Sequence, residues 1–161
     1  MNENNIAVKK AIVDEVASRF DQSVGVVLFE YRGLTVAQMT DLRRKLREVG
    51  AELAIYKNTL VRRAADKLGH EALKEHLTGP NALLFSSDLN AGAKVLTRFG
   101  RYHEEVVIKA GIFENRIVDE KGVRTIARLP DHNGMISMFL SVLNAPIQKF
   151  AATVKAVAEK E

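Results

Sequence analysis

The stretch VGVVLFE at residues 24–30 is a continuous run of apolar, mostly β-branched and aromatic residues with the length of one strand. Such a run predicts a strand that is buried on both faces of a sheet. The stretch YRGLT at residues 31–35 follows it. Gly33 permits a tight turn there, and Thr35 is a suitable N-cap for a helix that Gly50 ends. The sequence therefore predicts a strand–turn–helix unit at this point.

Working outward from this unit, helical and extended patterns alternate along the chain. Further helices are expected over 3–20, 59–68, 71–77, 89–102 and 119–127, and further strands over 51–56, 82–86, 105–112 and 116–118, with Asn58 as N-cap of helix 59–68 and a hairpin at Glu114-Asn115. Two strand–helix–strand units, 24–56 and 81–112, thus follow each other with an additional helix between them. This order predicts an α/β (α+β) fold, a two-layer ferredoxin-like βαββαβ sandwich with an extra N-terminal helix and a helical C-terminal extension. A doubly wound parallel sheet is the alternative, because sequence does not set the strand order.

The composition changes at Leu129-Pro130, beyond which the pattern is helical to the end. This change predicts two domains, residues 1–130 and 131–161. A break near Asn144 and Pro146 is expected to separate helix 133–143 from an amphipathic terminal helix within 145–161. The apolar stripe of that terminal helix consists of Ile147, Phe150, Ala151, Val154, Val157 and Ala158. Such a helix either packs back on its own domain or is offered to a partner.

Composition excludes several classes of protein and site. The 161 residues include no Cys, so disulfides, thiolate zinc sites and cysteine nucleophiles are excluded. No apolar run approaches the roughly 18 residues that a membrane span needs, and the charged first twenty residues do not form a signal-peptide core. We expect a soluble, cytosolic protein with no membrane contact.

The net positive charge is concentrated in one part of the sequence. Residues 30–63 hold eight cations and four anions, whereas the rest of the chain holds sixteen of each. A local excess in an otherwise balanced chain is typical of a surface that faces phosphates. A solvated helix face is the alternative interpretation.

Two loops in this basic segment are built alike. Arg32-Gly33 and Lys57-Asn58 each follow a strand and precede a helix. The two strands of a right-handed strand–helix–strand unit run in the same direction, so both loops and both helix N-termini are expected at one sheet edge. Helix N-termini bind anions, and Arg32, Lys57, Arg62 and Arg63 would add full charges. The sequence predicts a binding site for the phosphate backbone of a polyanion.

Signals for catalysis are weak by comparison. The sequence contains neither G-x-G-x-x-G nor G-x-x-x-x-G-K-[ST], the two fingerprints of a cradled nucleotide. The histidines are scattered without metal-ligand spacing, at positions 70, 76, 103 and 132. We expect no catalytic residue, no metal and no cofactor, and a nucleotide- or phosphoester-handling enzyme that uses the same helix N-termini is the alternative.

Several short motifs are specific when they occur together in this order. They are YRGLTV at 31–36, LR at 42–43, YKNTLVRRA at 56–64, GPNA at 79–82 and KAG at 109–111. In these motifs the sequence resembles the large ribosomal subunit protein ten family, the bacterial ribosomal stalk-base proteins, over its whole length. A nonribosomal relative that acts in ribosome assembly is a further alternative.

The resemblance implies a non-enzymatic constituent of the large subunit of cytoplasmic ribosomes. It implies that the N-terminal domain docks on the GTPase-associated region of large-subunit ribosomal RNA, next to a neighbouring ribosomal protein, and that in some bacteria the protein also binds its own mRNA leader. It further implies that the terminal helix anchors dimers of the acidic stalk protein, which recruit translational GTPases; the helix is short, so two dimers fit better than three. The expected RNA-binding residues are Lys9, Arg32, Gly33, Lys57, Asn58, Thr59, Arg62 and Arg63, and the expected stalk-binding residues are the six of the terminal stripe.

Overall fold

The computed structural model describes residues 3–70, 72–113, 116–130 and 132–158, with side chains described for 7–155 within these ranges except residue 132. The expected hairpin residues Glu114-Asn115 lie outside the described residues. The chain divides into two compact units, Met1–Arg128 and Leu129–Glu161, which are described separately below.

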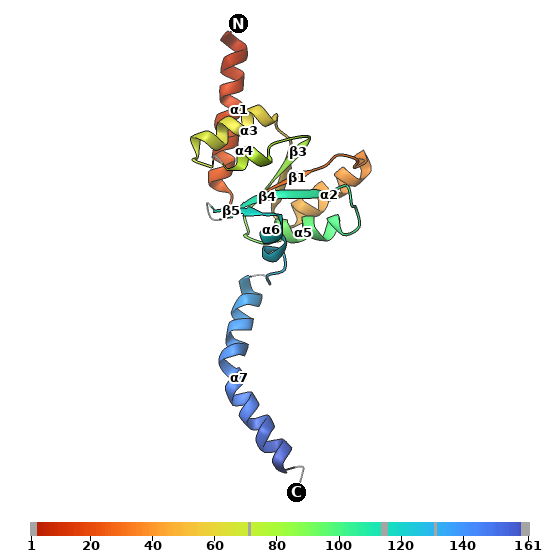
Figure 1. Cartoon of the computed structure of the whole chain (residues 1–161), viewed down its shortest axis with the longest axis vertical. Helices are drawn as coiled ribbons and strands as arrows, with labels where there is room; N and C mark the ends of the chain where they lie inside the picture. Colours follow the sequence, from red (N-terminus) through yellow and green to blue (C-terminus); the bar gives the residue numbers. More distant parts are fainter. Residues whose placement is uncertain (1–2, 71, 114–115, 131, 159–161) are drawn as a thin grey trace. The chain divides into compact units, whose positions relative to one another are not determined.

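The first unit is built on a sheet in which every neighbouring pair of strands is antiparallel. The strand order is β2-β3-β1-β4-β5 (Figure 1). The strands are β1 (Gly25–Glu30), β2 (Ala51–Ala54), β3 (Asn81–Ser86), β4 (Val107–Phe113) and β5 (Arg116–Asp119). Both β1 and β4 lie inside the sheet, and the run at residues 24–30 is its central strand, with Val26 to Phe29 all buried.

This strand order confirms the ferredoxin-like βαββαβ arrangement and rejects the parallel sheet. β1 and β2 both pair with β3, and β3 and β4 both pair with β1. Each strand–helix–strand unit therefore contains two strands that run in the same direction with one antiparallel strand between them. β5 extends the sheet beyond β4.

Helices cover both faces of the sheet. The helices of the first unit are α1 (Glu3–Gln22), α2 (Val36–Glu48), α3 (Asn58–Lys67), α4 (Leu73–His76), α5 (Ala91–Gly100) and α6 (Glu120–Ile126). α2, α5 and α6 pack on one face, as the βαββαβ pattern predicts. The N-terminal helix joins α3 and α4 on the other face, which a two-layer sandwich would leave open, so the sheet lies between two helical layers.

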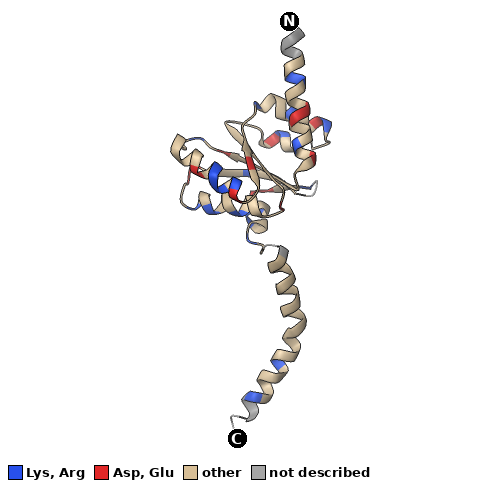
Figure 2. Cartoon of the chain, turned by 180° about the vertical axis from the view of Figure 1, so that it is seen from behind, with Lys and Arg blue, Asp and Glu red and all other residues tan. Residues whose placement is uncertain are grey.

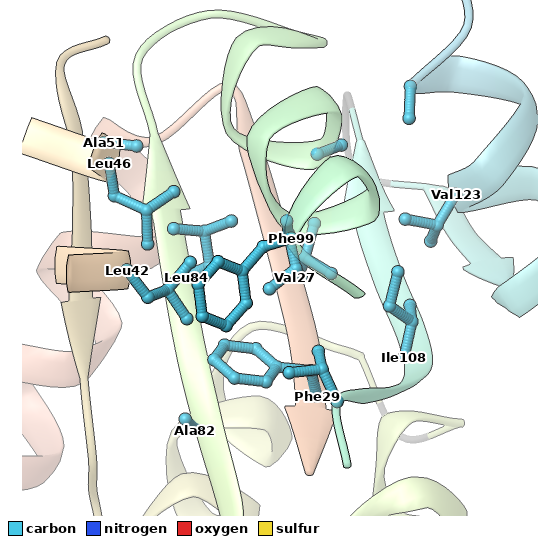
Figure 3. Packing of buried hydrophobic residues seen from close by; sticks show 14 of the residues in the cluster. Val27, Phe29, Leu42, Leu46, Ala51, Ala82, Leu84, Phe99, Ile108 and Val123 are labelled. Carbon is cyan, nitrogen blue, oxygen red and sulfur yellow. The ribbon is translucent and has the colours of Figure 1, made fainter. Parts of the chain in front are cut away.

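Two hydrophobic clusters hold these layers together, one on each face. Alternate residues of β1 supply both clusters, because Val27 and Phe29 point to the α2/α5/α6 layer and Val26 and Leu28 to the α1/α3/α4 layer. Figure 3 shows Phe29 of β1, Leu42 of α2 and Phe99 of α5 meeting in the first cluster. Because both faces of β1 are buried from Val26 to Phe29, a polar substitution at any of these four positions should cost packing.

Helix α2 begins where the sequence predicts it. Thr35 accepts a hydrogen bond from the backbone N–H of Gln38, whose side chain in turn accepts one from the backbone N–H of Thr35. This reciprocal pair is a capping box, which satisfies two N–H groups at the start of the helix. Gly50, with a φ of 69°, follows the helix and allows the chain to turn into β2.

The predicted start of α3 is wrong in one respect. Lys57, not Asn58, is the N-cap residue, and no side chain caps this helix. β2 is also shorter than expected, since it ends at Ala54 and not at Tyr56. The reason lies in Asn58, whose side chain bonds to a neighbouring loop, as described below, and so is not available to its own helix.

The second unit contains a single helix, α7 (His132–Ala158), with Pro146 inside it. The predicted break near Asn144 and Pro146 is therefore wrong. Proline removes one backbone donor from a helix interior and tends to bend it, and α7 is visibly curved in Figure 1, but its helical conformation continues on both sides. None of the helices in the described ranges has the length and apolar character that crossing a bilayer requires.

The first cluster should dominate the stability of the first unit. Leu84 on β3 is completely buried, so we expect Leu84→Ala to lower the free energy of unfolding by about 3 kcal/mol through lost burial and a residual cavity. Urea denaturation followed by circular dichroism would measure the change. Val36→Ala is the control, because Val36 is 85% exposed and should change stability by less than about 0.5 kcal/mol; equal effects of the two substitutions would contradict this packing.

Candidate nucleic-acid interface

Three loops meet at one edge of the sheet. β1 and β2 end there and β3 begins there, as the pairing of Glu30 with Asn81 and of Ala54 with Leu83 requires. We call residues 31–35, 55–58 and 77–80 at this edge the rim. The two loops that the sequence analysis singled out therefore lie at the same edge, with the loop before β3 between their strands.

Asn58 links two of the rim loops. Its Nδ2 donates a hydrogen bond of 2.8 Å to the carbonyl oxygen of Gly79, and its Oδ1 lies 3.5 Å from the Nδ2 of the buried Asn81. Gly79 adopts a φ of 76°, a left-handed conformation that favours glycine. The KN of residues 57–58 and the GPN of residues 79–81 are thus parts of one contact, and Asn58 has a structural role at the site.

Lys109 fastens the same loop from the side of β4. Its Nζ lies 2.7 Å from Oε2 of Glu30 and donates to the carbonyl oxygen of Thr78 at 2.6 Å and to Oδ1 of Asn81 at 3.1 Å. The lysine and glutamate side chains are only 17% and 23% exposed. Sequence reasoning did not assign a role to Glu30, Asn81 or Lys109; the only signal was that GPNA and KAG accompany the two basic loops.

The predicted RNA-binding residues divide into exposed groups and groups with structural partners. Arg32, Lys57, Thr59 and Arg63 are exposed. Arg62 is exposed as a residue, but its Nη2 donates to the carbonyl oxygen of Leu77 at 2.9 Å, so it also holds the loop before β3. The rim therefore offers charged groups to solvent while other side chains fix the loops that carry them.

Of the two remaining predicted residues, Gly33 lies in the rim and Lys9 lies outside it. Gly33 lies in the rim with a φ of 100°, and a Cβ there would lie 3.1 Å from Cγ of Glu105. Both the backbone conformation and this close approach require glycine. Lys9 is exposed on α1, and within the described residues no hydrogen bond or ion pair joins it to the rim.

The two helix N-termini at the rim differ in how they are capped. At α2 the Thr35 side chain already occupies the N–H of Gln38. At α3 no side chain caps the helix and its first turn contains no acidic residue. The N–H of Leu60 bonds instead to the carbonyl oxygen of Lys57 at 2.8 Å. The first two N–H groups of α3, those of Asn58 and Thr59, are therefore the candidate anion-binding donors at this helix, reinforced by the helix dipole.

Tyr56, within the rim, has a structural partner. Its hydroxyl donates a hydrogen bond of 3.1 Å to Oε1 of Glu15 on α1, and burial raises the pKa of this phenol. Glu15 also pairs with Arg19, whose guanidinium lies 2.9 Å from Glu52, and the hydrogen bond to Glu52 raises the pKa of Arg19. This network joins α1 to the end of β2, so Tyr56 positions the basic loop.

In the second unit, α7 exposes the predicted stripe and more. Ile147, Phe150 and Val154 are 70%, 72% and 53% exposed, and Ala151 is exposed as well. Val157 and Ala158 belong to the helix, but their side chains lie outside the described residues. The sequence analysis did not assign the equally exposed residues of the first half of α7, which are Met135, Ile136, Met138, Phe139, Leu140, Val142 and Leu143. Their apolar character was visible in the sequence, but it also fits a buried helix.

The contacts of Lys109 should determine how firmly the loop before β3 is held at the rim. We expect Lys109→Met to leave the Glu30 carboxylate and the Asn81 side chain without their charged partner, and to lower the free energy of unfolding by about 2 kcal/mol. Hydrogen exchange should show faster exchange in residues 77–81. Lys121→Met is the control, because Lys121 is an exposed lysine of α6; an unchanged exchange rate in the loop before β3 would show that Lys109 does not hold it.

Comparisons with known proteins give matches in both units. A model of the family described as "Ribosomal protein L10" matches residues 4–100, and one described as "Ribosomal protein uL10 C-terminal region" matches residues 129–161. The chain is 50% identical over 157 residues to large ribosomal subunit protein uL10 of Staphylococcus aureus strains JH9 and Newman, covering 97% of this chain and 95% of each relative. The chain thus belongs to the ribosomal protein L10 family.

Proposed function

We propose that the rim binds large-subunit ribosomal RNA at the GTPase-associated region, and that α7 anchors dimers of the acidic stalk protein that recruit translational GTPases. Family membership makes the chain a structural protein of the large ribosomal subunit, located on the ribosome in the cytoplasm. The division of labour follows the two units, with RNA binding assigned to residues 1–130 and stalk binding to residues 131–161.

The observation that carries the RNA proposal is the meeting of two basic loops and an uncapped helix N-terminus at one sheet edge. Lys57 is the N-cap residue of α3, and Arg63 lies on the second turn of this helix. Arg32 and Gly33 follow β1 at the same edge, where the glycine lets a backbone approach closely. Exposed cations and free N–H groups together suit phosphate oxygens, which fix the position of an RNA without reading its bases.

We assign different roles to the residues of the proposed interface. Arg32, Lys57, Thr59 and Arg63 contact phosphates directly, Gly33 admits the RNA backbone, and Lys9 is an outlying contact from α1. Asn58 and Arg62 hold the loop before β3 in place through Gly79 and Leu77. The alternative of an enzyme that uses the same helix N-termini has less support, because the relatives are named as ribosomal proteins.

The proposal for α7 rests on its exposed apolar side chains. Phe139 and Phe150 are 64% and 72% exposed, an exposure that an isolated helix in water does not favour and that a partner would remove. The exposed residues fall into two segments on either side of Pro146, one from Met135 to Leu143 and one from Ile147 to Val154. With about ten residues for each dimer, the 27 residues of α7 accommodate two dimers and are too few for three.

The remaining partners follow from the resemblance. A neighbouring ribosomal protein would share the RNA site with the first unit. The protein's own mRNA leader would bind to the same rim, because a phosphate-binding surface accepts any RNA with a similar shape. A role of a nonribosomal relative in ribosome assembly is less well supported, because the C-terminal family region is present at residues 129–161.

Neutralising the rim should weaken RNA binding in a salt-dependent manner. We expect Lys57→Gln with Arg63→Gln to reduce the magnitude of the slope of log K against log salt by about 1.4 to 1.8, because two phosphate contacts are lost. Filter binding to a transcript of large-subunit ribosomal RNA would measure it. Lys149→Gln with Lys155→Gln removes the same charge from α7, and an equal effect of this control pair would contradict a site at the rim.

Single substitutions in the two segments of α7 should separate the two stalk sites. We expect Phe139→Glu and Phe150→Glu each to reduce the number of captured stalk-protein dimers from two to one, and the double variant to abolish capture, because each places a charge in an apolar interface. Native mass spectrometry of the purified complex would count the dimers. Gln148→Glu adds the same charge at an exposed polar position, and an unchanged count in the Phe139→Glu variant would show that the first segment is not a site.

A further inference from the structure

The helices on one side of the first unit carry more net charge than the whole chain. Residues 36–48, 91–101 and 120–128, which form α2, α5 and α6 with their C-terminal neighbours, contain ten Lys and Arg and three Asp and Glu, against a net charge of +4 for the full sequence. The helices of the opposite layer, α1, α3 and α4, contain seven cations and six anions. We call the outer surface of α2, α5 and α6 the arginine face; Figure 2 shows blue segments on several of its helices.

Most arginines of this face have no partner. Arg43, Arg47, Arg98, Arg101 and Arg128 are exposed, and their side chains form no ion pair or hydrogen bond with any other described residue. By contrast, Arg44 and Lys45 share Asp41, and Arg124 pairs with Glu120. On α2 the free arginines Arg43 and Arg47 are spaced at i and i+4, and Arg98 of α5 and its C-cap residue Arg101 at i and i+3, so the two side chains of each pair are neighbours on the helix surface.

A hollow between α5, α6 and the start of β4 adds a more specific feature. It encloses about 210 Å³ and is lined by Arg101, Arg124 and Arg128. Thr97 also lines it, and the Thr97 hydroxyl is buried without a hydrogen-bond partner among the described residues. A buried donor without a partner costs free energy unless a ligand accepts from it. An oxygen-rich anion would satisfy the hydroxyl and the guanidinium groups together.

The chemistry of the face favours RNA over a protein partner. Protein interfaces need an apolar or aromatic centre, whereas nucleic-acid interfaces are polar and strongly positive. Within the three helical segments of the face, Val36 at the very start of α2 is the one large apolar residue that is exposed. Seven of the ten cations are arginines, whose planar guanidinium binds phosphate oxygens in pairs.

The C-terminal half of α2 carries the part of the face that lies apart from the rim. Arg101, by contrast, lies shortly before Glu105, whose side chain approaches Gly33 of the rim. α2 begins at the rim with Val36, and Arg47 is eleven residues further along, about 17 Å away on a helix that rises 1.5 Å per residue. Arg43 and Arg47 line a shallow hollow with Gly50 and Ala51, at the end of β2 opposite the rim. One short RNA segment gripped by the rim would therefore leave these arginines unoccupied.

We propose that the arginine face is a second RNA-binding surface, which contacts the phosphates of a different segment of the RNA from the one that the rim holds. The protein then bridges two segments of the large-subunit RNA and fixes their relative position. The identity of the RNA rests on the proposed function, whereas the existence of a second phosphate-binding face rests on the free arginines and the hollow with Thr97.

The experiment compares two variants of the intact chain on one RNA, a transcript of large-subunit ribosomal RNA. Arg43→Gln with Arg47→Gln alters the face at the end far from the rim, and Lys57→Gln with Arg63→Gln alters the rim. Each pair should reduce the magnitude of the salt slope by about 1.4 to 1.8, since two phosphate contacts are lost in each. Phosphate-ethylation interference should show that the two variants lose sensitivity at two different, non-overlapping sets of phosphates.

Two controls distinguish direct phosphate contacts from the overall electrostatic attraction between the protein and RNA. Arg116→Gln with Lys149→Gln removes two exposed charges outside the face and the rim, and should leave the interference pattern unchanged. Arg43→Lys with Arg47→Lys keeps the charge and should keep the salt slope while weakening binding several-fold, because lysine cannot bind phosphate in the paired geometry.

The outcomes separate failure of this inference from failure of the proposed function. If the rim variant weakens binding and the face variant behaves like the Arg116→Gln control, the second surface does not exist. If neither variant changes RNA binding, the proposed RNA interaction itself is wrong. If the face variant instead loses only the capture of a polyglutamate probe while its RNA slope is unchanged, the face binds acidic protein and the proposal is overturned.

Discussion

The partly buried ion pair between Lys109 and Glu30 is the interaction on which the functional edge of the domain depends. Three loops must be held together where β1 and β2 end and β3 begins, and loops carry few hydrogen bonds of their own. Lys109 supplies a charge to Glu30 and donors to Thr78 and Asn81, while Asn58 connects Gly79 to α3. A phosphate site works only if its donors are fixed before the ligand arrives, because ordering them on binding would cost affinity. The exposed cations of the rim are therefore useful only because buried polar groups restrain the loops.

The fold could be predicted from sequence because its pattern is redundant. The buried run at residues 24–30, the capping box of Thr35 and the turn at Gly50 are local signals, and two copies of the same strand–helix–strand order leave few possible topologies. The N-cap of α3 could not be predicted in the same way. Asn58 is a good cap by propensity, but its amide bonds to Gly79, 21 residues away. A long-range contact of this kind has no local signature.

Pro146 is the position in the second unit where local sequence signals give the wrong helix boundary. Proline usually ends or bends a helix, so the sequence predicts a break. Strong helix formers and apolar residues on both sides outweigh the loss of one backbone donor in α7. The position of the proline between two exposed apolar segments nevertheless has a consequence. A bend there changes the direction of the stripe between the segments, so two partners bound along one helix need not compete for the same space.

The arginine face shows that charged residues can be evenly spread along the sequence and yet gather on one surface of the fold. In sequence the cations of α5 and α6 are diluted by acidic residues in the neighbouring loops, such as Asp88, Glu104 and Glu105, and residues 30–63 stand out alone. Folding places the helices in one layer and the acidic residues in the loops between them. Like charges on adjacent helices repel one another, which destabilises the free domain unless a polyanion offsets the repulsion. A surface that keeps unpaired arginines on α2 and α5 and directly after α5 and α6 is better explained by a bound phosphate backbone than by the requirements of the fold.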